Sequence, residues 1–202
     1  KSAAFGIAAA ELIASGCKRI VLTAPRRRAA HAVEAHAHAL LDEIQAGALV
    51  YMSPDELLRE PAEADLLLVD EAAGIPAPVL ETLLRRYSRV AFATTVHGYE
   101  GTGRGFAVRF NQVLDRHSNG WKALQLHTPV RWAADDPLEI LVNRALLLDA
   151  EPAAAESFGA GDDWKFELLD RDRLLEDADT LRELFGLLVV AHYRTRPFDV
   201  RH

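Results

Sequence analysis

Two adjacent carboxylates, Asp70 and Glu71, follow the apolar run Leu66–Val69. Four apolar residues are too few for a helix and too uniformly apolar for a half-exposed strand, so they predict a strand buried on both faces of a parallel sheet. Ligands bind at the carboxyl ends of such strands. Asp70 would hold the shell of a Mg²⁺ ion, and Glu71 would orient and deprotonate an attacking water, which is the chemistry of nucleotide hydrolysis. An acidic turn without chemistry is the alternative interpretation.

A lysine and a serine, Lys1 and Ser2, open the chain at the start of a helix rich in small apolar residues. Lys-Ser is the tail of a P-loop, in which the lysine reaches the β- and γ-phosphates and the hydroxyl ligates Mg²⁺. The glycines of a P-loop are missing, so Lys1-Ser2 alone is weak evidence, and a start at this point indicates a cut or a missing loop and not a natural start. Together with Asp70 and Glu71, the pair favours a P-loop NTPase in which Ser2 and Asp70 hold the metal.

The composition bounds the class of protein. The chain has 202 residues, of which 50% are hydrophobic and 26% are charged, as in an ordinary globular protein. The net charge of −7 argues against a protein coated in nucleic acid, although a local basic stripe could still bind RNA. A single cysteine, Cys17, excludes a disulfide framework and fits a reducing compartment. Because no membrane span or signal peptide is visible, we expect a cytoplasmic protein without a membrane partner.

Strand and helix patterns alternate along the first half of the chain. We expect four strands, separated by helices that end near residues 46, 58 and 86; the strands are at 19–25, 49–51, 66–69 and 89–95. Ser53 followed by Pro54 predicts a capped helix start. This rhythm predicts an α/β fold with a doubly wound, mostly parallel sheet. Together with Lys1-Ser2 and Asp70-Glu71, the expected fold class is a RecA-like P-loop NTPase. Later elements are expected as strands at 124–126 and 166–169 and helices at 136–148 and 180–191, the last capped by Thr180.

Polar residues follow two of the expected strands. The strand at 89–95 ends in two threonines, Thr94 and Thr95, where RecA-like ATPases place a sensor of the γ-phosphate, and Thr94 is the expected nucleotide contact. A threonine pair at a strand end is also common without a function. The arginines Arg26, Arg27 and Arg28 follow the strand that stops at Pro25, where nucleic-acid-stimulated NTPases often contact the phosphate backbone. Three solvated arginines at a helix start are an equally good interpretation.

A glycine-rich stretch at 96–106 is the most distinctive part of the sequence. Four glycines surround Tyr99, Glu100 and Arg104. Glycines suggest a backbone that adopts unusual conformations and that packs closely against a ligand or another part of the protein. The stretch does not have the pattern of an acetyl-CoA pyrophosphate loop. We therefore predict a lid or a nucleic-acid-binding loop beside the γ-phosphate sensor.

Several segments together resemble the RNA cytidine acetyltransferases. The most specific are the glycine-rich stretch and the Pro-Val-Arg-Trp-Ala segment at 129–133; the others are residues 1–3, 23–25, 69–76, 94–95, 136–139 and 191–197. They follow the order of that family along the chain. Members combine a RecD-like helicase module that hydrolyses ATP with a GNAT acetyltransferase domain and a tRNA-binding region. The resemblance implies that acetyl-CoA and ATP are used to form N4-acetylcytidine in tRNA, in bacteria at the wobble position of elongator tRNA(Met).

The resemblance also implies the roles of individual residues and the domain boundaries. Residues 1–150 would form the RecA-like helicase/ATPase module. Residues 151–202 would form a linker, at 151–163, and a segment leading into the acetyltransferase domain. Glu71 is the expected catalytic residue. The expected nucleotide contacts are Lys1, Ser2, Ala3, Ala4, Asp70, Thr94 and Arg131, the metal ligands Ser2 and Asp70, and the RNA contacts Arg26, Arg27, Arg28, Tyr99 and Arg104. For Arg131, an ion-paired arginine beside a buried Trp132 is the structural alternative.

Two other classes of function stay open at this stage. A generic RecD-like DNA helicase would share Lys1-Ser2 and Asp70-Glu71 but would not need the glycine-rich stretch or Arg131-Trp132. A module that binds partners without nucleotide is the third possibility, because the P-loop glycines are missing. Stimulation of ATP hydrolysis by RNA or by DNA separates the first two classes, and ATP binding excludes the third.

Overall fold

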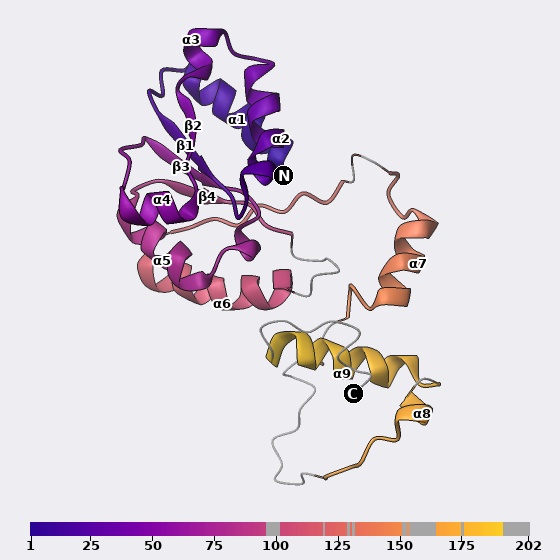
Figure 1. Ribbon diagram of the computed structural model, residues 1–202. Coiled ribbons are helices and arrows are strands. Elements are labelled where there is room, and N and C mark those ends of the chain that lie inside the picture. The colour runs from indigo at the N-terminus through magenta and orange to yellow at the C-terminus, as the bar shows by residue number, and fades with distance from the viewer. Residues whose placement is uncertain are drawn as a thin grey trace. The chain divides into compact units, whose positions relative to one another are not determined.

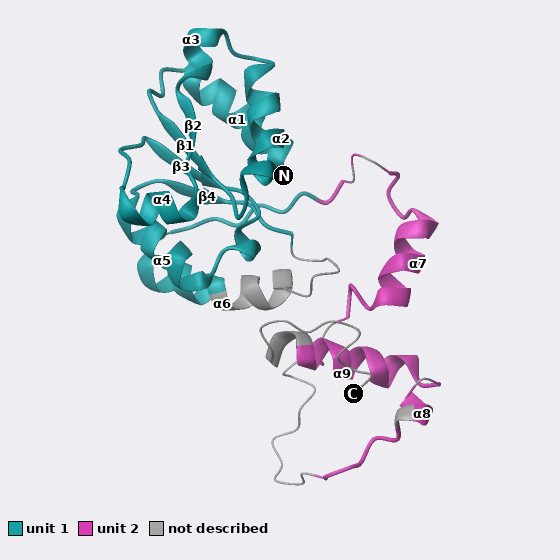
Figure 2. Cartoon of the chain, viewed as in Figure 1, with its two compact units in different colours: residues 1–95, 106–126 teal, residues 96–105, 127–202 magenta. Residues whose placement is uncertain are grey.

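The computed structural model describes residues 1–95, 102–118, 120–128, 130, 132–150, 153, 165–174 and 176–191, with the backbone alone described at 102–109, 171 and 189–191. It divides into two compact units (Figure 2). Unit 1 comprises residues 1–95 and 106–126, and unit 2 comprises 96–105 and 127–202. The domain boundary near residue 150 stays a prediction.

Unit 1 is built on a four-stranded parallel sheet with the strand order β2-β1-β3-β4. The strands are β1 (Ile20–Thr23), β2 (Leu49–Tyr51), β3 (Leu66–Val69) and β4 (Val90–Phe92). The helices are α1 (Ser2–Ala14), α2 (Arg27–His38), α3 (Glu43–Ala46), α4 (Pro54–Arg59), the 3₁₀ turn η1 (Ala72–Gly74), α5 (Ala77–Arg86) and α6 (Thr102–His117). The predicted α/β class with a parallel sheet is confirmed, and the apolar run Leu66–Val69 is an interior strand as expected.

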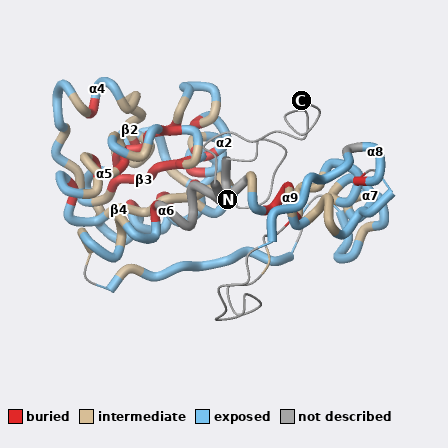
Figure 3. Tube along the Cα trace, turned by 90° about the horizontal axis from the view of Figure 1, so that it is seen from below, coloured by how far each residue is buried: buried red, intermediate tan, exposed pale blue. Residues whose placement is uncertain are grey.

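Alternate side chains of the strands point into two separate apolar layers. Val21, Leu67 and Val69 pack with residues of α4, α5 and α6, whereas Ile20, Leu22 and Leu68 pack with residues of α1 and α2. Figure 1 shows these two groups of helices on opposite faces of the sheet, and Figure 3 shows the buried residues gathered along it. The period of two in β-strands explains why so short a run of leucines serves both layers.

The helix that carries Lys1 and Ser2 is held close to its neighbour by a glycine. A Cβ atom placed on Gly6 would lie 2.4 Å from the Val33 carbonyl oxygen and 2.6 Å from His36 Cβ. The small residues of α1 therefore let its backbone approach α2 directly. This contact fixes where the N-terminus of α1 lies over the sheet.

Side-chain hydrogen bonds secure the helices of the opposite face. Ser53 and Glu56 form the predicted cap of α4, since the Ser53 side chain accepts from Glu56 N and Glu56 accepts from Ser53 N at 2.7 Å. At the other end of α4, the Arg86 guanidinium donates to the Leu57 and Leu58 carbonyls at 3.0 and 2.9 Å. The C-terminal carbonyls of a short helix are thereby satisfied by α5.

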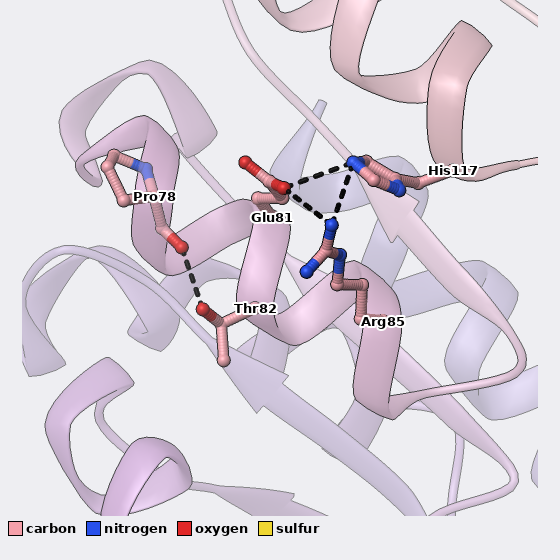
Figure 4. A network of polar contacts seen from close by, with 5 residues as sticks. All are labelled: Pro78, Glu81, Thr82, Arg85 and His117. Atoms are coloured by element: carbon pink, nitrogen blue, oxygen red, sulfur yellow. Dashed lines mark hydrogen bonds and ion pairs between the residues drawn. The ribbon is translucent and has the colours of Figure 1, made fainter.

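A polar cluster joins α5 to the end of α6 (Figure 4). Glu81 Oε1 lies 3.2 Å from Arg85 Nη2 and 3.0 Å from His117 Nε2. On the sheet side, the rings of Phe92 and Phe110 meet edge to face with centroids 4.8 Å apart. The C-terminal part of α6 is thus anchored on both its polar and its apolar side.

Unit 2 contains the helices α7 (Pro137–Leu146), α8 (Arg171–Leu174) and α9 (Ala178–Ala191). Asp136 caps α7 by accepting from Leu138 N and Glu139 N, and Trp132 Nε1 donates to Glu139 at 2.7 Å. Phe185 is buried with Ala150, next to an ion pair between Arg182 and Asp149 at 3.1 Å.

Several element predictions are wrong. The helix expected to run to residue 46 ends at His38, and a second helix, α3, starts after a capping box at Asp42. The glycine-rich stretch is helical from Thr102, and the last helix begins at Ala178, with Asp177 accepting from Thr180.

The described residues 124–126 and 166–169 form no strand, and Leu124 and Phe166 are exposed. An alternating pattern indicates a strand face, but a strand also needs a neighbour. Most of the expected linker at 151–163 lies outside the described residues.

Candidate functional site

The start of α1 meets the carboxyl ends of β3 and β4. The Ser2 hydroxyl donates to Asp70 Oδ2 at 2.6 Å, and Lys1 Nζ donates to Thr95 Oγ1. Asp70 follows directly on β3, and Thr95 lies shortly after the end of β4 at Phe92. Both are therefore at the edge of the sheet where ligands of α/β proteins bind. Two pairs of residues far apart in the sequence are therefore brought to one place.

The N-terminal turn of α1 contributes backbone groups to this place. Lys1 is the N-cap residue, and its carbonyl accepts from Phe5 N at 3.0 Å. The first amides of a helix lack intrahelical acceptors and form its positive end, which favours anions. Ala3 and Ala4 lie in this turn, half-buried and exposed respectively, so their expected contact with phosphate would be made by the backbone.

Asp70 is fully buried, and donors hold both of its carboxylate oxygens. Oδ2 accepts from Ser2, and Oδ1 accepts from the Glu71 amide at 3.0 Å. Its own amide donates to the Thr23 carbonyl at 2.9 Å, which continues the ladder between β1 and β3. A buried carboxylate is costly unless it is paired, and here the pairing fixes its orientation toward α1.

Glu71 adopts a left-handed backbone conformation, with φ 49° and ψ 45°. This conformation costs a residue with a Cβ atom about 1–3 kcal/mol, so the surrounding contacts must impose it. Those contacts are visible, because Gly74 N donates to the Glu71 carbonyl and Ala72 N donates to the Ala93 carbonyl, both at 2.9 Å. The turn leaves the Glu71 side chain exposed beside the buried Asp70.

The turn after β3 also packs tightly against the end of β1. A Cβ atom on Gly74 would lie 2.7 Å from Pro25 Cγ. The Thr23-Ala24-Pro25 segment thus supports the turn that carries Glu71. No larger residue fits at Gly74 without moving Pro25.

The two threonines after β4 differ in their contacts. Thr94 is half-buried, and its hydroxyl donates to the Thr95 carbonyl at a long 3.4 Å. Thr95 is exposed and accepts the hydrogen bond of Lys1. The sensor role of Thr94 stays a prediction, and the structure identifies Thr95 as the member of the pair that contacts Lys1. The sequence signal was the threonine pair itself, which could not show which member faces α1.

The three arginines after β1 lie in unlike surroundings. Arg27 pairs with Glu34 at 2.6 Å, and its guanidinium lies 4.6 Å from the centroid of the Tyr51 ring. The hydrogen bond to Glu34 raises the pKa of Arg27 further, so the charge is permanent but already partnered. Arg26 and Arg28 are exposed. Of the three, Arg26 and Arg28 are therefore the better candidates for contacts with RNA phosphates.

Three expected site residues cannot be placed by their side chains. Tyr99 and Arg131 lie outside the described residues, and for Arg104 only the backbone, in the first turn of α6, is described. Their expected contacts with RNA or nucleotide stay predictions.

The donor set at Asp70 suits a magnesium ion shared with a nucleotide. Within the described ranges, no group of three or more His, Cys, Asp or Glu side chains could hold a metal alone. Mg²⁺ instead takes one or two protein oxygens and completes its shell with water and phosphate oxygens. The Ser2 hydroxyl and the Asp70 carboxylate match that requirement. In the part of the chain that is described, no helix has both the length and the apolar character needed to cross a membrane.

Comparison with known proteins places the chain in a family. Residues 1–149 match the family model described as RNA cytidine acetyltransferase NAT10/TcmA, helicase domain. Proteins named tRNA(Met) cytidine acetyltransferase TmcA are similar over 99–100% of this chain, with 54% identity in Nitrosococcus halophilus, 44% in Haloferax volcanii and 41% in Vibrio cholerae. The chain spans 29–30% of the length of these relatives. The chain therefore belongs to the RNA cytidine acetyltransferase NAT10/TcmA helicase-domain family.

Proposed function

We propose that this chain is the ATP-hydrolysing, helicase-like module of a cytoplasmic tRNA(Met) cytidine acetyltransferase. The observation that carries the proposal is the pairing of Ser2 with Asp70 and of Lys1 with Thr95 at one edge of the sheet. A hydroxyl and an ammonium at the start of a helix, next to a buried carboxylate at the end of a strand, are groups suited to binding a nucleoside triphosphate with Mg²⁺.

Each residue has a distinct role in the proposed reaction. The Lys1 ammonium and the first-turn amides of α1 would bind the phosphates, while Ser2 and Asp70 would hold Mg²⁺. The bound ion would neutralise charge that develops on the phosphate oxygens. Glu71, exposed beside Asp70, orients the attacking water and accepts its proton. The left-handed turn at Glu71 follows the end of β3, so this residue does not continue the strand, and its side chain is exposed next to Asp70.

Acetyl transfer itself is proposed for the complete protein, with acetyl-CoA as the acetyl donor. Relatives of this chain are named as tRNA(Met) cytidine acetyltransferases, and the sequence contains no pattern of an acetyl-CoA pyrophosphate loop. The product would be N4-acetylcytidine at the wobble position of elongator tRNA(Met). This module would couple ATP hydrolysis to the handling of tRNA, with Arg26, Arg28, Tyr99 and Arg104 as candidate RNA contacts.

The test is steady-state ATP hydrolysis by the protein expressed at its full encoded length, with magnesium, and with either tRNA or single-stranded DNA added. We expect hydrolysis that depends on magnesium and is stimulated by tRNA more than by DNA. Equal stimulation by both would favour a generic RecD-like helicase. Absence of ATP binding in calorimetry would leave only a module that binds partners without nucleotide.

A further inference from the structure

The hydrogen bond between Lys1 and Thr95 joins an expected phosphate ligand to a residue without an assigned role. We infer that Thr95 is a positioning residue, which holds the Lys1 ammonium in place for the phosphates of ATP. The inference rests on the proposed function, because it concerns the same nucleotide site. It adds a residue that acts through Lys1 and not through the nucleotide itself.

Lys1 needs such a partner because little else restrains its side chain. It is exposed, and it precedes the first turn of α1. A lysine side chain is a point charge on a flexible stem with many rotamers, so its ammonium samples many positions when it is free. A hydrogen bond that the ammonium donates to a fixed acceptor restricts its position before a ligand arrives, and pre-organisation of this kind strengthens binding.

The Thr95 hydroxyl is such a fixed acceptor, because the end of β4 is tied to the end of β3. The Ala93 amide donates to the Val69 carbonyl at 2.8 Å, and the Ala93 carbonyl accepts from Ala72 N at 2.9 Å. These bonds fix the backbone two residues before Thr95 relative to the strand that carries Asp70. The ammonium of Lys1 is thereby placed with respect to the same strand end as the carboxylate of Asp70.

Thr94 cannot take this part in the described arrangement. Its hydroxyl donates to the Thr95 carbonyl at 3.4 Å, whereas the contact with Lys1 is made by Thr95 Oγ1. The two threonines therefore have separable roles, and substitution can tell them apart.

Two anchors connect α1 to the sheet, one on each neighbouring strand. Ser2 bonds to Asp70 after β3, and Lys1 bonds to Thr95 after β4. Loss of the Thr95 hydroxyl leaves the Ser2 anchor and the charge of Lys1 intact. The expected consequence is weaker ATP binding with a nearly unchanged turnover number, because Glu71 and Asp70 keep their places.

The experiment measures KM for ATP, kcat and melting temperature for four substitutions in the full-length protein. For Thr95→Val we expect KM to rise about tenfold, the usual weight of a hydrogen bond to a charged group, with kcat within about twofold of wild type. Thr95→Ser keeps the hydroxyl, so its KM should be close to that of wild type. Thr82→Val removes a hydroxyl bonded to the Pro78 carbonyl at 2.8 Å, away from the site, and serves as the matched control.

The fourth substitution, Lys1→Ala, separates this inference from the proposed function. If Lys1→Ala leaves both KM and kcat unchanged, the assignment of a P-loop lysine fails, and the inference fails with it. If Lys1→Ala raises KM and Thr95→Val does not, only the inference is overturned. When Lys1→Ala and Thr95→Val are combined, the KM should equal that of Lys1→Ala alone, and additive effects would contradict positioning. A KM that rises with Thr95→Ser as much as with Thr95→Val would also contradict it.

Discussion

The two ends of β3 carry the same type of residue in opposite situations. Asp65, just before the strand, is exposed, and one of its oxygens accepts from the amides of Lys18 and Arg19 at 2.9 and 3.0 Å. Asp70, just after the strand, is buried, and it accepts from the Ser2 hydroxyl and the Glu71 amide. Exposure alone would therefore not single out Asp70, the aspartate of the proposed nucleotide site.

The difference lies in what each carboxylate is bonded to. Asp65 joins the beginning of β1 to the beginning of β3 through backbone amides, which no ligand can replace. Asp70 is bonded to a side-chain hydroxyl at the start of a helix, in a place where parallel strands end and helices begin. An ion can share that hydroxyl and that carboxylate without breaking the sheet. The amino end of the strand thus has backbone amides as partners of its carboxylate, whereas the carboxyl end has the side-chain groups that the proposed ligand would use.

The strongest test of this division is Glu71→Gln at the carboxyl end. The substitution removes the proposed base but keeps the size of the side chain and leaves Asp70 in place. We expect ATP hydrolysis to fall about 10²–10⁴-fold while ATP binding is retained. Turnover and calorimetric binding should be measured on the same preparation, with Glu63→Gln, an exposed acid near the amino end, as the control. Unchanged turnover would show that Glu71 is not the base.

A second test exchanges the two aspartates for asparagine one at a time. Asp70→Asn should lower ATP hydrolysis about 10–100-fold by weakening the hold on Mg²⁺, with a melting temperature near that of wild type. Asp65→Asn should do the reverse, lowering the melting temperature while the turnover of the folded protein is unchanged. If both substitutions reduced turnover to the same extent, the proposed difference between Asp65 and Asp70 would be wrong.

How far the sequence predicts this arrangement depends on whether a signal is local. The strand Leu66–Val69 and the Ser53 cap were predicted because a buried run and a capping box are complete within a few residues. The meeting of Ser2 with Asp70 followed from two motif fragments with known partners. These predictions needed no knowledge of packing.

The missed features all depend on neighbours that the sequence does not identify. Which threonine faces Lys1 depends on how β4 ends against β3, and the pairing of Arg27 with Glu34 depends on rotamers on α2. The strand predicted at 124–126 is wrong, because the segment forms no strand and Leu124 and Leu126 are exposed. A strand needs a pairing partner, and the partner is not encoded in the segment itself.

Gly6 gives a test of how α1 is held over the carboxyl end. Gly6→Ala should lower the free energy of unfolding by about 1–3 kcal/mol, because the new Cβ would press on the Val33 carbonyl and on His36. Urea unfolding measures the effect. In the control Gly47→Ala, the new Cβ has one contact, at 3.3 Å from the Ile44 carbonyl, and should change stability by less than about 1 kcal/mol. Equal effects would mean that α1 and α2 are not closely packed.

The smallest expected effect is a dependence of stability on acid at the amino end. The hydrogen bonds from the Arg19 and Lys18 amides hold the pKa of Asp65 below its usual value of 3.8. A group with a lowered pKa in the folded state stabilises the fold above its unfolded pKa, and this contribution is lost as the pH falls through the folded pKa.

The stability gap between wild type and Asp65→Asn should therefore be constant above about pH 5 and should narrow below about pH 4. Urea unfolding midpoints of both proteins, measured from above about pH 5 down to about pH 3, test the expectation. The comparison between the two proteins is needed because other carboxylates also titrate in this range. If the stability difference between wild type and Asp65→Asn stayed the same down to the lowest pH, the two amide partners would not bind the ionised form of Asp65 in preference to the protonated form. In that case the bonds to Lys18 and Arg19 would serve only to orient the chain, and an asparagine would serve as well.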